Sequence, residues 1–150
     1  MKIVFISFVV LYIIVHNLEM YYKRRILTVA DLKIGKKKFV LMVLQWCAEN
    51  IHDNNTSFDL KIVYKKPTKI MGRYSYYYQR MEIYIDESMG LLSLTNTAIH
   101  EFTHVLQGAP KKHLYKHPTN YLDDPMEIEA RKFAEQFQNR CYDEIVPKVT

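Results

Sequence analysis

Two histidines and a glutamate at a fixed spacing are the residues of this chain best suited to chemistry. The stretch His100-Glu101-Phe102-Thr103-His104 follows the pattern HExxH. On an α-helix, positions i and i+4 project from one face about one turn apart, so both imidazoles can reach a single ion. Zinc binds neutral imidazole nitrogen, and Glu101 can then act on the metal-bound water as a general base. The spacing therefore predicts a zinc site with His100 and His104 as ligands.

A third protein ligand is needed, because catalytic zinc usually has three such ligands and a water. The candidates downstream are His113 and His117 in a loop, and Glu127 and Glu129 in the final helix. The two loop histidines do not fit the register of the HExxHxxGxxH pattern. A glutamate is therefore expected, which gives a His-His-Glu site. Both glutamates flank the apolar arc of the final helix, Glu127 slightly nearer its centre, so the residues alone leave the choice open.

The helix that carries the motif is predicted to begin near Leu91 and to end at Gly108, with Pro110 just beyond. At about 100° per residue, its apolar side chains fill one arc and both histidines lie on the opposite one, with Glu101 at the boundary. We therefore expect one buried face and one face that exposes the histidines in a cleft. The apolar arc consists of Leu91, Leu92, Leu94, Ala98, Ile99, Phe102, Val105 and Leu106.

Hydrophobic periodicity predicts the other elements. Residues 37–53 have helical spacing, and residues 58–64 alternate as a strand does. Residues 70–86 indicate a hairpin with arms at 73–77 and 81–85 and a turn near 78–80. The last helix is expected from Pro125 to about Asp143. These elements predict an α+β fold with a small antiparallel sheet beside the two site helices, and with the helix at 37–53 packed behind.

The composition sets limits on the class of protein. A chain of 150 residues with 49% hydrophobic and 25% charged residues is typical of one soluble globular domain and excludes a disordered chain. The formal net charge of +5 indicates a mildly basic, solvated exterior, and no nucleic-acid-binding motif accompanies it. No nucleic-acid partner is therefore expected. Cys47 and Cys141 are expected to be two buried free thiols.

The amino-terminal segment 1–26 is predicted to be separate from a single domain at 27–150. Its apolar run, residues 3–15, is shorter than the ~20 residues of a membrane-spanning helix and has no signal cleavage site after it. A core helix, a short membrane anchor and an uncleaved signal all remain open, and Met20 is an alternative start. The location is accordingly cytoplasmic or membrane-anchored.

The site segments together resemble the gluzincin metallopeptidases, in particular minimal domains found among phage, mobile-element and uncharacterised microbial proteins. The resemblance is sharpest from Tyr74 to Phe137 and rests on HEFTHVLQ, on the Tyr-x-x-x-Pro-x-Glu-x-Glu-Ala stretch and on Phe133-Ala134. In gluzincins a second helix bears the glutamate ligand, often within ExxA. The resemblance thus implies Glu127 as the third ligand, with Glu129 as the fallback.

The resemblance also implies a zincin-like fold. In zincins, a strand before the metal helix borders the cleft and can pair with an extended peptide, and residues 81–85 are expected in that place. An ordinary interior strand would show the same pattern. Many gluzincins carry an acidic residue or Asn directly after the ExxA alanine. Here Arg131 stands at that position, so no carboxylate that orients a histidine is implied there.

The function predicted from these residues is a zinc-dependent peptidase that acts on a peptide or protein substrate. Glu101 accepts a proton as water attacks and passes it to the leaving amine. Tyr121, His117 and His113 are candidates to stabilise the oxyanion, whereas Gln107 is expected to be structural. One alternative is a zincin-fold sensor or interaction module that binds metal without peptidase activity. Another is a nucleic-acid-associated protease.

Overall fold

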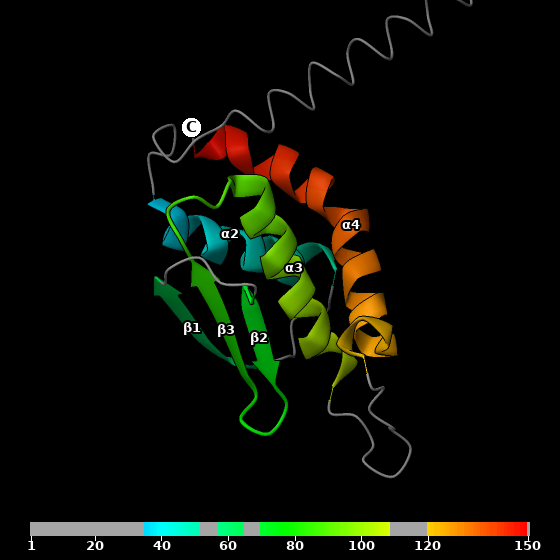
Figure 1. Cartoon of the computed structure of the whole chain (residues 1–150). Coiled ribbons are helices and arrows are strands. Elements are labelled where there is room, and N and C mark those ends of the chain that lie inside the picture. Colours follow the sequence, from blue (N-terminus) through cyan, green and yellow to red (C-terminus); the bar gives the residue numbers. More distant parts are fainter. Residues whose placement is uncertain (1–34, 52–56, 65–69, 109–119, 150) are drawn as a thin grey trace, which may run out of the picture.

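The computed structural model of the chain describes residues 35–51, 57–64, 70–108 and 120–149 (Figure 1). Three longer helices and one three-stranded sheet make up this part, so the α+β class is confirmed. The amino-terminal segment 1–26 lies outside the described residues, and the proposed domain boundary stays a prediction. The elements are α2 (Gly35–Asn50), β1 (Asp59–Tyr64), β2 (Gly72–Ser75), β3 (Arg80–Ile85), α3 (Leu91–Gln107), η2 (Tyr121–Asp123), α4 (Pro125–Ile145) and η3 (Val146–Lys148).

The sheet is mixed, so the expectation of an antiparallel sheet was wrong. Strands β2 and β3 form the predicted antiparallel hairpin, with the turn at Tyr76–Gln79, but β1 pairs with β3 in parallel. The strand order is β1-β3-β2. Strand β2 begins at the end of the sheet where β1 ends, and β3 lies between them. Local periodicity carries no information about this order.

Strand β3 lies in the centre of the sheet, so the expectation that residues 81–85 border the cleft as an edge strand was wrong. Met81, Ile83 and Ile85 alternate along β3, are fully buried and belong to the core shared with the helices. The edge next to α3 is formed instead by β2, the shorter arm of the hairpin (Figure 1). The strand beside the site is thus one element earlier in the chain than predicted.

Helix α3 lies in the middle of the molecule and contacts the sheet, α2 and α4 (Figure 1). It begins at Leu91 and ends at Gln107, where Gly108 adopts a φ of 67°, as the glycine signal predicted. The face that carries the histidines is less exposed than expected, because His104 and Thr97 on the same face are buried. Both histidines line a cavity, in agreement with the expected cleft. Helix α4 packs over that face. The motif therefore lies in the interior of the protein.

Helices α2 and α4 complete the core. Asp124 caps α4 by accepting a hydrogen bond from the backbone N–H of Met126 at 2.9 Å, which fixes where the helix begins. The two helices meet where Trp46 Nε1 donates to Glu144 Oε2 at 2.7 Å. Cys47 and Cys141 are buried and free, as predicted.

One lysine is buried, although the net charge predicts a basic, solvated exterior. Lys36, in the first turn of α2, donates from Nζ to the backbone carbonyls of Asp86 and Glu87, both at 2.8 Å. These bonds tie the start of α2 to the loop that follows β3. No helix among the described residues is long and apolar enough to cross a membrane.

The outer face of the sheet is organised around one carboxylate. Glu82 in the central strand lies opposite Lys61 of β1 and Arg73 of β2. Its Oε2 accepts hydrogen bonds from Tyr84 Oη at 2.7 Å and from Arg73 Nε at 2.8 Å. The hydrogen bond from Tyr84 has the largest effect on Glu82, and together with that from Arg73 it lowers the pKa of Glu82 below its ordinary value. Burial opposes this shift but is the weaker effect.

This lowered pKa predicts an acid-sensitive contribution to stability. Because the pKa is lower in the folded state, the stabilisation is present above the unfolded pKa and is lost as pH falls through the folded value. Glu82→Gln should lower the free energy of unfolding by about 1 kcal/mol at neutral pH, and the difference should shrink below pH ~4. Urea unfolding across this range measures it. A Glu82→Gln deficit that is independent of pH would contradict the assignment, and Glu135→Gln, at an exposed position of α4, is the control.

Candidate active site

His100 and His104 lie one turn apart on the side of α3 that faces α4. Their Nε2 atoms are 3.3 Å apart, and the two rings meet edge to face with centroids 4.9 Å apart. The side chain of His104 is 7% exposed and that of His100 is 16% exposed. The predicted convergence of the two imidazoles is therefore present in a nearly closed environment.

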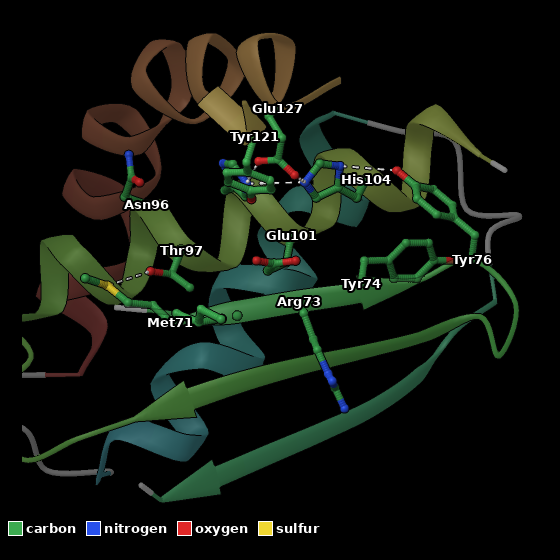
Figure 2. A pocket seen from close by; sticks show the side chains of 13 residues that line it. Met71, Arg73, Tyr74, Tyr76, Asn96, Thr97, Glu101, His104, Tyr121 and Glu127 are labelled. Atoms are coloured by element: carbon green, nitrogen blue, oxygen red, sulfur yellow. Dashed lines mark hydrogen bonds and ion pairs between the residues drawn. The ribbon is translucent and has the colours of Figure 1, made fainter. Parts of the chain in front are cut away.

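Glu127 completes this group from the first turn of α4. Its Oε2 lies 3.2 Å from His100 Nε2, and its Oε1 lies 3.2 Å from His104 Nε2 (Figure 2). One ligand atom from each of the three residues lies within 4.8 Å of the others. Glu129, the fallback, is exposed and contacts Gln107 instead. The structure brings Glu127 to the histidines, and its role as a ligand stays a prediction.

The donor set of this group fits a metal cation. Burial, and then the charge of the neighbouring His104, lower the pKa of His100 below its ordinary value, which favours the neutral ring. Neutral imidazole nitrogen and carboxylate oxygen are the ligands that zinc takes in catalytic sites. Glu127 Oε2 is buried and makes no hydrogen bond with good geometry in the described part of the chain. A group of lone pairs that face one another at these distances is compatible with a metal site.

Glu101 points from α3 toward β2, beside the group (Figure 2). It is buried, and burial followed by the charge of Glu127 raises its pKa to about 8. Its Oε2 has no hydrogen-bond partner among the described residues. A buried carboxylate oxygen that accepts no hydrogen bond is unusual in a folded protein. It marks a place where a small polar molecule can be held.

A cavity of about 550 Å³ adjoins both Glu101 and the His-His-Glu group. It lies between the edge strand β2 and α3, and η2 bounds it on a further side (Figure 2). Aliphatic and aromatic side chains from Ile70 to Tyr76 form one wall, and Asn96 and Thr97 of α3 lie along the other. The size is that of a ligand site.

Comparison with known proteins identifies the family of the chain. The model of the peptidase M78 family, described as the IrrE N-terminal-like domain, matches residues 55–138. The chain belongs to this family. The matched segment contains the sheet, α3, η2 and the first part of α4, and therefore every residue of the group just described. No curated protein and no solved structure matches the chain.

Membership of the peptidase M78 family supports the coarse prediction of a zincin-like metallopeptidase. It does not test the individual site residues. Of the predicted oxyanion stabilisers, Tyr121 is a largely exposed residue that lines the cavity from η2, and partial desolvation of its phenol followed by a hydrogen bond to Glu127 raises its pKa. His113 and His117 lie outside the described residues.

Gly72 is a site residue that the sequence analysis did not single out. A Cβ built on Gly72 would lie 2.6 Å from both Cγ and Oε1 of Glu101 and 2.8 Å from its Cδ. The Glu101 side chain thus occupies the space that a side chain on β2 would need. A glycine inside a strand often marks such a close approach, and this was the available signal.

Replacing Gly72 should therefore disturb Glu101. Gly72→Ala should lower the free energy of unfolding by about 1–3 kcal/mol through overpacking. In a Glu101→Ala background the clashing atoms are gone, so the same substitution should cost much less. Urea unfolding of the four proteins in this double-mutant cycle measures the coupling.

Gly90→Ala is the matched control. A Cβ on Gly90 meets no atom within 4 Å, and its φ of −72° suits alanine. The cost should be about 0.5–1 kcal/mol, because alanine is a poorer residue than glycine at the start of a helix, and it should be the same with and without the Glu101 side chain. Equal costs of Gly72→Ala with and without the Glu101 side chain would contradict the contact.

Proposed function

We propose that this M78-family protein is a zinc-dependent peptidase of the gluzincin type. His100, His104 and Glu127 are the zinc ligands, and Glu101 is the general base. The observation that carries the proposal is the convergence of two imidazole nitrogens and a carboxylate within 4.8 Å, beside a buried carboxylate with an unpartnered oxygen. Each of the three ligand types and their number agree with catalytic zinc.

The chemistry divides between the ion and the chain. When bound, zinc polarises the scissile carbonyl and makes a water more acidic. Glu101 accepts the proton from that water as the oxygen attacks the carbonyl carbon. It then gives the proton to the leaving amine as the C–N bond breaks. Burial of Glu101 and its contact with Gly72 hold the carboxylate beside the cavity in which this exchange takes place.

A peptide is the substrate that fits the cavity best. Strand β2 lies at the end of the strand order, so its outer edge pairs with no other strand among the described residues. An extended peptide can add to such an edge through backbone hydrogen bonds. Tyr121 lies across the cavity from β2 and is the described candidate to donate a hydrogen bond to the oxyanion.

Substitution of the base should separate binding from catalysis. Glu101→Gln keeps the size of the side chain but cannot accept the proton, so the rate of peptide cleavage should fall about 10²–10⁴-fold. Zinc content, measured by elemental analysis, should remain one ion per chain. Cleavage by Glu101→Gln at the wild-type rate would refute the assigned base.

Substitution of the ligands should remove the metal itself. His100→Ala, His104→Ala and Glu127→Ala should each lose zinc and cleavage together, whereas Glu135→Gln, at an exposed position of α4, should lose neither. The substrate for both measurements is a denatured protein mixture, with and without chelator. Stoichiometric zinc without any chelator-sensitive cleavage would instead identify a metal-binding sensor or interaction module.

A further inference from the structure

Gln107 joins the metal group to a second glutamate of α4. It lies three residues after His104, at the last position of α3. Its Oε1 is 2.8 Å from His104 Nδ1. Its Nε2 is 2.9 Å from Glu129 Oε2 and 2.9 Å from the backbone carbonyl of Met126. A single amide therefore links the end of α3, the first turn of α4 and one of the two histidines.

These contacts fix which group donates in each hydrogen bond between Glu129, Gln107 and His104. Glu129 Oε2 and the Met126 carbonyl are acceptors only, so the side of the Gln107 amide that faces them must be its NH₂ group. The carbonyl oxygen Oε1 then faces His104. Because Oε1 can only accept, His104 Nδ1 carries the proton. In the neutral ring the lone pair is then on the other nitrogen, Nε2, which faces His100 and Glu127.

No other group of the described residues makes a comparable contact with Nδ1. Tyr76 Oη lies 3.4 Å away, at the limit of a hydrogen bond, and is also 3.9 Å from Met126 Sδ (Figure 2). Arg131, which directly follows Ala130, donates to the backbone carbonyl of Leu122 at 2.6 Å. Gln107 therefore makes the shortest contact with Nδ1 of His104 among the described residues.

We propose that Gln107 is a positioning residue that holds His104 in the Nδ1–H tautomer, and that Glu129 acts through Gln107 by fixing its amide. The proposal rests on the proposed function in that His104 is taken as a zinc ligand. A hydrogen bond to the second ring nitrogen orients a ligating histidine and raises its basicity. Here the neutral amide of Gln107 makes that hydrogen bond, and the carboxylate of Glu129 accepts a hydrogen bond from the same amide. Glu129 thus supports a ligand without being one.

The tautomer can be measured in the metal-free protein. Long-range ¹H–¹⁵N correlation spectra distinguish a protonated ring nitrogen from an unprotonated one, with His104→Gln identifying the signals. Wild-type His104 should have a proton on Nδ1. In Gln107→Met, which keeps the chain length but removes the acceptor, His104 should shift toward the Nε2–H form that an unpartnered imidazole favours. A wild-type His104 protonated on Nε2 overturns the proposal.

Zinc affinity provides the second readout, measured by competition with a chromophoric chelator. Gln107→Met should weaken zinc binding about 10- to 100-fold. Glu129→Gln should weaken it less, and should have no further effect in the Gln107→Met background, because Glu129 acts through Gln107. Glu135→Gln on the same helix is the control and should bind as wild type does. Additive effects of the two single substitutions overturn the role given to Glu129.

The two proposals fail differently. Zinc that binds elsewhere, unaffected by His104→Ala, refutes the proposed function, while the tautomer of the metal-free protein still decides the hydrogen-bond assignment. Zinc bound by His104 with no response to Gln107→Met refutes the positioning role and leaves the peptidase proposal standing. A Gln107→Met protein that does not fold leaves the wild-type tautomer and the Glu129→Gln affinity as the deciding measurements.

Discussion

Lone pairs from His100, His104 and Glu127 face one another at 3.2–3.3 Å in a space that is almost closed to water. Such an arrangement is costly unless a cation or a proton is shared among the three groups, because buried polar atoms must be compensated. Two helices hold it in place: α3 provides the histidines and α4 provides the glutamate. Every other feature of the site, from Glu101 to Gln107, is arranged around this one convergence.

Helix α3 is both the central element of the core and the carrier of the site. Ala98, Ile99 and Phe102 belong to the buried core, while His100 and Glu101, which lie between them in sequence, face α4 and β2. The cleft expected beside the polar arc is more covered than predicted, because α4 packs onto that arc. Solvent reaches the histidines through the cavity beside β2, so the same packing that stabilises the fold also sets the dielectric of the site.

The parts predicted well from the sequence are those set by local spacing. Helix α3 ends at Gln107 because Gly108 follows, and the two histidines converge because four residues make about one turn. The choice between Glu127 and Glu129 needed the resemblance, since both residues flank the same apolar arc. In the structure that choice depends on how α4 crosses α3, which places Glu127 at the histidines and Glu129 at Gln107.

The parts that were missed depend on contacts between distant segments. The parallel pairing of β1 with β3 and the edge position of β2 follow from the strand order, and period-two patterns are the same in every order. Gly72 is separated from Glu101 by the whole of β3, so its contact is invisible to local patterns. The position of Gln107 at the helix end predicts only a structural role. Its hydrogen bonds to α4 depend on how the two helices pack, which the local sequence does not show.

The boundaries of the matched family segment differ from those of the buried interior. Of the 22 buried core residues in the described part of the chain, 11 lie outside residues 55–138. Six of them come from α2 and five follow Arg140, from Cys141 to Val149. A fragment excised at the family boundaries would keep all the polar groups of the site but would leave half of its apolar packing exposed to solvent. The apolar core that stabilises the site is therefore larger than the segment that the family model matches.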